Sequence, residues 1–325
     1  MIYQNIIFIF ITIFEIPSLI FLIFVHIILI LPSHKEKFSS TFYSLLFWNG
    51  IIDIVSYLSF TLHHRFPNYG IFTNAYYNFY LNQTDVRVLE FLRNYTNISQ
   101  LIGTFFISFN RFTSLMFPVK HRFLWKKLLP LALIVIFLLP VILTWPILCD
   151  KMGYVPQNTS DINVGFRAKW LTNNAEWYNS FIVMTVLSFI FLLACLIINL
   201  STLIILIKMS LNNNINKEGG KQKFNFTRER NFFLSALISF MGQLLLGIDN
   251  YVSGQFSQTK QYDNFYLMVM IFPIVNDLTI FPNVWLMLYI STPLRTIVFG
   301  FFKKQKSVII IGQANTTLQI RSFVK

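Results

Sequence analysis

Seven long apolar runs dominate this sequence and limit the folds that are open to it. Each run has about 20 residues or more, the length that a helix needs to cross a hydrocarbon core about 30 Å thick. The runs cover residues 6–31, 42–62, 89–117, 128–148, 179–207, 232–251 and 265–290. Only 12% of the residues are charged, whereas soluble domains average about 25%. We therefore predict an all-α integral membrane protein, a bundle of seven transmembrane helices.

The basic residues between the runs predict the orientation of this bundle. Residues 32–41, 110–127, 208–230 and 291–325 together hold 19 of the Lys and Arg residues, whereas residues 63–97, 149–178 and 253–263 hold seven. Because cytoplasmic loops are enriched in Lys and Arg, we expect the N-terminus outside and the C-terminus in the cytoplasm. The net charge of +13 is then a topology signal, and we expect no nucleic-acid partner.

We predict one receptor domain over residues 1–304 and a cytoplasmic tail over residues 305–325. Leu294, Ile297, Val298 and Phe301 follow helical spacing next to basic residues. This pattern favours an amphipathic helix at 292–304 that lies on lipid at the inner leaflet. The alternative is an ordinary basic segment beside the membrane.

Several polar side chains lie inside the predicted spans, where they are costly and usually face the bundle interior. Asp53 and Asp277 lie at depths that allow them to meet, with Asn49 one turn before Asp53 and Asn276 and Asn283 on the last span. These five residues indicate a polar core, and an ion or proton site is one interpretation. The other is that they satisfy backbone groups freed by prolines or join helices.

Two further groups are candidates for ligand binding and for switching. Asp249, Tyr251 and Tyr266 lie near the outer ends of the last two spans, and we expect a ligand to enter between the outer halves of the third, fifth, sixth and seventh helices. Asp249 can equally be a solvated acid at the interface.

At the inner face, Asn110, Arg111 and Phe112 close the third span, and Glu229 begins the sixth. An Arg111–Glu229 bridge would hold a resting state, although Arg111 can also extend to lipid phosphates.

We found no sequence pattern for catalysis or cofactor binding, such as HExxH, GxSxG or a Walker A loop. We therefore expect neither an enzyme nor a cofactor. His63 and His64 are adjacent, and because neighbouring side chains on a helix diverge, we do not expect them to bind a metal. Asn82 and Asn158 begin Asn-x-Ser/Thr patterns on the predicted outer side and are candidate N-glycosylation sites.

Several segments resemble a known family. Three segments, NRFTSLMFPVKHRFLWKKLLP at 110–130, LLPVILTWPIL at 138–148 and SSTFYSLLFWNGIID at 39–53, are similar to nematode serpentine chemoreceptors of the Srg superfamily. Class gamma is the most similar class, and class v is the alternative. The resemblance implies a G-protein-coupled chemosensory receptor at the plasma membrane, with a heterotrimeric G protein and a small-molecule ligand as partners. A ligand-gated channel or transporter that uses the intramembrane acids remains the alternative.

Overall fold

The structure, a computed structural model, describes residues 2–34, 36–172, 174–175, 177–215, 226–259 and 261–300. Within these residues, seven helices have at least 20 residues each. They are α1 (Ile2–Ile30), α2 (Thr41–Phe60), α5 (Arg87–Met116), α6 (His121–Thr144), α7 (Ser180–Ile215), α8 (Phe226–Gln258) and α9 (Tyr262–Ile290). Each overlaps one of the seven apolar runs.

Six of the described helices are both long and apolar enough to cross a membrane, and α5 is the exception among the seven. Arg87, Glu90, Arg93 and Arg111 lower its hydropathy. However, α5 packs against α2, α6, α7 and α8, so that its polar side chains lie against other helices. A polar helix can cross a bilayer when its neighbours shield it from lipid.

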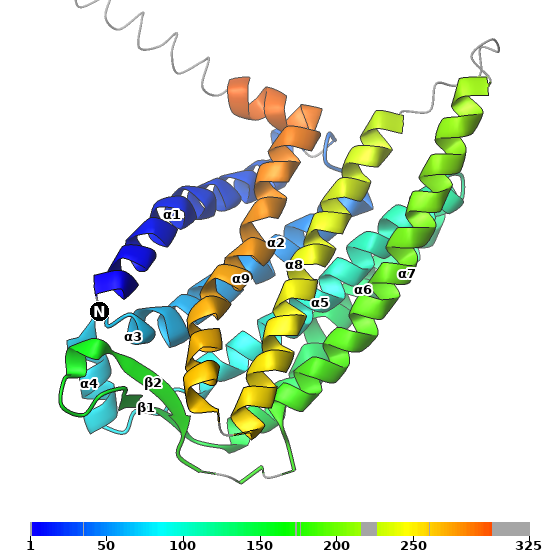
Figure 1. Ribbon diagram of the computed structural model, residues 1–325. Helices are drawn as coiled ribbons and strands as arrows, with labels where there is room; N and C mark the ends of the chain where they lie inside the picture. The colour runs from blue at the N-terminus through cyan, green and yellow to red at the C-terminus, as the bar shows by residue number, and fades with distance from the viewer. Residues whose placement is uncertain are drawn as a thin grey trace, which may run out of the picture. The chain divides into compact units, whose positions relative to one another are not determined.

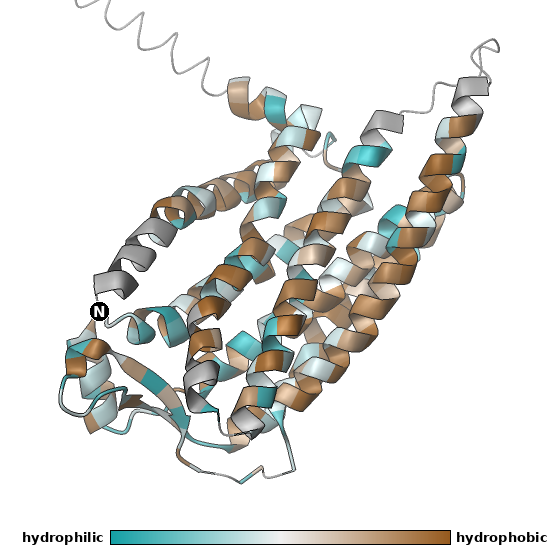
Figure 2. Ribbon diagram, in the orientation of Figure 1, coloured by the Kyte–Doolittle hydropathy of each residue, from teal (hydrophilic) through white to brown (hydrophobic). Residues whose placement is uncertain are grey.

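The outer surface of the helices is apolar, which is the inverse of a soluble protein. Hydrophobic residues dominate α7 in Figure 2. Large apolar side chains such as Leu138 and Ile142 on α6 and Phe189 and Ile197 on α7 are exposed. In water such continuous apolar surface would drive aggregation, whereas in a bilayer it faces lipid tails.

Most of the short elements gather at one end of the bundle (Figure 1). They include the π-helix η2 (Thr61–Arg65), α3 (Phe66–Asn68), α4 (Thr73–Leu81), and the strands β1 (Met152–Pro156) and β2 (Phe166–Trp170). The strands pair antiparallel, with Tyr154 opposite Ala168. We call this the hairpin end. The 3-10 turns η1 (Pro32–His34), η3 (Trp145–Cys149) and η4 (Ile162–Val164) complete the described elements. The last turns of α7 and the first turns of α8 lie at the opposite end.

A small aromatic core holds the hairpin end together. Tyr76 of α4 packs edge-on against Tyr154 of β1, with ring centroids 4.9 Å apart, and stacks on Phe166 of β2. Burial raises the pKa of Tyr76 to about 12, so its phenol stays protonated and donates to the Leu62 carbonyl at 2.6 Å. Gly165 has φ +118°, and a Cβ there would collide with the Pro67 carbonyl, so only glycine fits.

Two glycines allow close helix contacts in the bundle. A Cβ on Gly103 of α5 would overlap the side-chain oxygen of Asn49 on α2, and a Cβ on Gly242 of α8 would lie 2.9 Å from the Thr279 Cα of α9. Small residues at such crossings let helix backbones approach within membranes.

The chain divides into two compact units, residues 1–284 and residues 285–325. Within the second unit, residues 292–300 are helical, and the Leu294 amide donates to the Ser291 hydroxyl at 3.4 Å at the start of this helix. The rest of the predicted amphipathic helix and the tail at 305–325 lie outside the described residues.

Candidate functional site

A pocket lies near the hairpin end between α2, α5, α7, α8 and α9, with about 430 Å³ of space that includes open solvent at its mouth. Its apolar lining comes from Phe60, Phe181, Val269 and Phe272, and its polar lining is His64, Arg93, Asn250 and Ser253. Pockets for small molecules have a mainly apolar lining with a few placed polar groups, and the lining of this pocket has that character. We expected a ligand to enter between the third, fifth, sixth and seventh long helices, which are α5, α7, α8 and α9. The pocket lies between these four helices and, in addition, α2.

Two of the candidate ligand residues, Asp249 and Tyr251, are not among the described residues that line this pocket. Asn250 and Ser253 lie on the face of α8 that lines the pocket. Tyr251 is rotated from Asn250 by about 100° around the helix axis, so it lines a separate groove together with residues of α7. Asp249 is buried, and neither of its carboxylate oxygens has a hydrogen-bond partner among the described residues. The side chain of Tyr266 lies outside what the structure describes.

Asp53 and Asp277 do not meet as the sequence suggests. Asp277 Oδ1 accepts from Arg65 Nη2 at 2.8 Å. Arg65 is the last residue of η2, which continues α2, and it lies about 18 Å beyond Asp53 at about 1.5 Å per residue. Asp53 Oδ1 instead accepts from Gln100 Nε2 on α5 at 2.7 Å. The expected shared site was wrong because the register of α9 places Asp277 beside the hairpin end of α2.

Arg65 is the buried cation that the sequence did not single out. Its guanidinium pairs with both Asp277 of α9 and Glu15 of α1, and Tyr57 donates to Glu15 Oε2 at 3.1 Å. All three charged residues are buried. One cation therefore joins three helices, and we had counted it only as a loop residue.

The other members of the expected polar core have separate surroundings. Asn49 faces Gly103 of α5, and Asn283 Oδ1 accepts from Ser239 of α8 at 2.8 Å. Asn276 is buried, with no hydrogen-bond partner for its amide among the described residues. The contacts of the other four, Asn49, Asp53, Asp277 and Asn283, therefore lie at several different pairs of helices.

At the opposite end of α5, Arg111 is enclosed by α2 and α8. Its guanidinium carbon lies 3.7 Å from the ring centroid of Phe42 and 4.4 Å from that of Phe232. Its Nη1 lies 3.8 Å from Glu229 Oε2 at the start of α8. We call Arg111, Phe42, Phe232 and Glu229 the arginine clamp. Arg111 is only 7% exposed, so its charge does not extend into the lipid headgroups.

The two neighbours of Arg111 differ in their surroundings. Asn110 is buried. Its Nδ2 donates a hydrogen bond of 3.0 Å to the Oγ1 of Thr41, the first residue of α2. Its Oδ1 accepts from Arg111 at 3.2 Å. Phe112 is half-buried. Asn110 therefore supports the clamp from α2.

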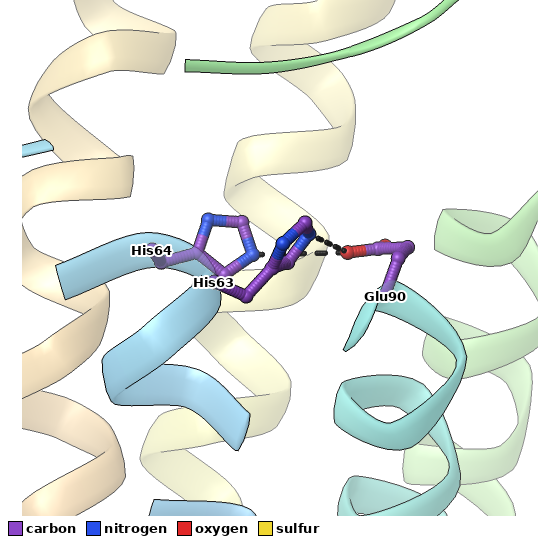
Figure 3. Close-up of side chains that lie close together, drawn as sticks. All are labelled: His63, His64 and Glu90. Atoms are coloured by element: carbon purple, nitrogen blue, oxygen red, sulfur yellow. Dashed lines mark hydrogen bonds and ion pairs between the residues drawn. The ribbon is translucent and has the colours of Figure 1, made fainter. Parts of the chain in front are cut away.

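A second polar cluster lies at the hairpin end. His63 and His64 of η2 both face Glu90 of α5, with Nε2 to Oε2 distances of 3.1 and 3.7 Å (Figure 3). Our expectation that the two side chains diverge was wrong. They lie in a π-helical turn, which is wider than an α turn, and Glu90 reaches both. The adjacent histidines were the only sequence signal for this cluster.

The comparisons with known proteins agree with this architecture. The family model of the serpentine type 7TM GPCR chemoreceptor Srv matches residues 8–304. The chain belongs to the Srv family of serpentine chemoreceptors. It is therefore a multi-pass receptor of the plasma membrane, and the seven-helix prediction and the resemblance to nematode serpentine receptors are confirmed.

Relatives of this Srv-family receptor come from both classes that the resemblance left open. Serpentine receptor class V-1 of Caenorhabditis elegans is 25% identical over 281 residues, which cover 84% of this chain and 82% of that receptor. Serpentine receptor class gamma-13 of the same organism is 23% identical over 240 residues, which cover 73% of this chain and 64% of that receptor.

Proposed function

We propose that this serpentine receptor binds a small external chemical cue in the pocket at the hairpin end and activates a heterotrimeric G protein at the opposite end. The observation that carries the proposal is that one helix, α5, takes part in both places. Arg93 lines the pocket and Arg111 occupies the clamp, about 27 Å further along the helix at about 1.5 Å per residue.

The orientation supports this assignment. The excess of Lys and Arg in the alternate connections favours an arrangement with the hairpin end outside. Asn82 and Asn158, the candidate glycosylation sites, are exposed at that end. The basic residues Lys120, Arg122 and Lys126 are exposed at the start of α6 at the opposite end, where a G-protein α-subunit would dock.

The ligand would act by favouring one of two arrangements of α5 and α8. The pocket includes Arg93 of α5 and Asn250 of α8, and the clamp joins the same two helices. A cue that fits the pocket better when the clamp is open shifts the receptor toward that state. Asp53 and Asp277 have separate partners, so their positions give no support to an ion path. We therefore do not propose a channel or transporter as a second function.

The test uses cells that express the receptor and report G-protein activation by the cue. Arg111→Ala is expected to abolish the response while surface delivery remains normal. Arg230→Ala, an exposed arginine one residue after Glu229, is the matched control and should respond normally. A full response from Arg111→Ala, or a cue-evoked current that survives a G-protein block, would contradict the proposal.

A tag at the N-terminus tests the orientation separately. It should be accessible to antibody in intact cells. Labelling that appears only after permeabilisation would place the hairpin end inside.

A further inference from the structure

We propose that His63, His64 and Glu90 form a binding site for a divalent transition-metal ion of the zinc type, joining η2 to α5 beside the pocket. The three ligand atoms lie within 4.8 Å of one another. Figure 3 shows both imidazoles facing one end of the Glu90 side chain. Two histidines and one carboxylate match the ligand set of open zinc sites, which keep a further position for water.

The distances fit an ion placed between the three groups. Zinc binds histidine nitrogen at about 2.0–2.1 Å and carboxylate oxygen at about 2.0–2.2 Å, so that ligand atoms around a tetrahedral ion lie about 3.3 Å apart. The observed separations from Glu90 Oε2 are 3.1 Å for His63 Nε2 and 3.7 Å for His64 Nε2. All three ligand atoms lie within 4.8 Å of one another, so the side chains need only draw together around the ion to complete the site.

The surroundings of His64 Nε2 also favour a bound ion, because its contact with Glu90 Oε2 at 3.7 Å is too long for a hydrogen bond. Its Nε2 is buried and makes no hydrogen bond with any described residue, although it faces the Glu90 carboxylate. A buried ring nitrogen without a partner loses the free energy of the hydrogen bond it would make to water. A metal ion bound to Glu90 Oε2 would restore a partner to it.

Tyr154 supports the role of His63. His63 Nδ1 lies 3.1 Å from the Tyr154 hydroxyl, which can in turn donate to the His63 carbonyl at 3.3 Å. In that arrangement Nδ1 carries the proton, and Nε2 presents its lone pair toward Glu90. Histidines that bind metals commonly donate their other N–H in this way, which fixes the ring.

Arg93 limits the affinity of the site without blocking it. Arg93 Nη2 lies 2.5 Å from Glu90 Oε1, and Nε lies 3.0 Å from Oε2. The carboxylate can keep Oε1 on Arg93 while Oε2 binds the ion. Because His64 and Arg93 both line the pocket, the pocket provides the path by which the ion enters.

The experiment measures zinc binding to the full-length receptor in lipid nanodiscs, with an affinity tag that lacks histidine. We expect saturable binding, and a Tm that rises with Zn²⁺ but not with Mg²⁺, which prefers oxygen ligands. His64→Ala should weaken zinc binding by at least about tenfold. His121→Ala, at the start of α6, removes a histidine elsewhere and should bind as the unaltered receptor does.

Three results would overturn the site: no saturable zinc binding to the unaltered receptor, equal affinity in His64→Ala, or an equal loss in His121→Ala. If His64→Ala does not fold, Arg93→Gln provides the decision. Removing the competing cation should tighten zinc binding, and an unchanged or weaker affinity would count against the site. None of these measurements depends on signalling, so the metal site and the proposed function can fail separately.

Discussion

The arginine clamp leads to a quantitative prediction about which contact holds the receptor at rest. The two perturbations are Glu229→Gln, which removes the ion pair, and Phe232→Leu, which removes one aromatic face from Arg111. Glu229 lies in the first turn of α8, where the helix dipole already stabilises its carboxylate without Arg111. The structure therefore predicts that the aromatic contact matters more than the salt bridge.

The magnitudes follow from the geometry. The ion pair is long, at 3.8 Å, and the Glu229 side chain is 20% exposed, so we expect about 0–1 kcal/mol from it. Phe232 lies 4.4 Å from a guanidinium that is almost fully buried, a contact worth about 1–2 kcal/mol when desolvated. If both contacts exist only at rest, signalling without ligand should rise at most about fivefold in Glu229→Gln and about five- to thirtyfold in Phe232→Leu.

The assay is ligand-free G-protein activation divided by the amount of receptor at the cell surface. The matched control is Phe233→Leu, the same substitution one residue further along α8. Phe233 is also buried, but it packs with Leu115 and Leu206. This control should leave ligand-free signalling unchanged, which separates the loss of the cation contact from the loss of aromatic volume.

Two results would refute this reasoning. If Glu229→Gln activates the receptor more than Phe232→Leu does, the ion pair is the dominant contact. If Phe233→Leu activates as strongly as Phe232→Leu, the effect comes from packing of α8 and not from Arg111.

Three other changes test the structure. Arg65→Met leaves two buried carboxylates without their cation and should lower the free energy of unfolding by about 3–5 kcal/mol, as measured by thermal unfolding in detergent. The control Arg87→Met, at a partly exposed ion pair, should lower it by less than about 1 kcal/mol. Equal losses in the two variants would contradict the burial argument. Gly103→Ala should lower the Tm because its Cβ overlaps the Asn49 side chain, and adding Asn49→Ala should restore it; no rescue would show that α2 and α5 cross differently. Asn158→Gln should increase the mobility of the receptor in gels by the loss of one glycan, and unchanged mobility would argue against modification there.

Part of the candidate site was predictable from residue types and spacing. Arg111 and Glu229 stand at the ends of two apolar runs on the same predicted face of the membrane, so a contact between them needed only two neighbouring helices. The structure places them within ion-pair distance, and the switching role stays a prediction. The two phenylalanines around Arg111 were not predictable, because aromatic residues occur throughout a chain with 37 phenylalanines.

The local order of the chain follows from its residues taken in sequence. Runs of apolar side chains long enough to cross a bilayer must form helices, since only helices satisfy their own backbone groups there, and basic connections indicate their direction. Contacts between distant residues depend on how the helices rotate and slide against one another. That packing placed Arg65 between Glu15 and Asp277 and brought Glu90 to the two adjacent histidines. Small shifts in helix register decide such pairings, and a single sequence carries no direct record of them.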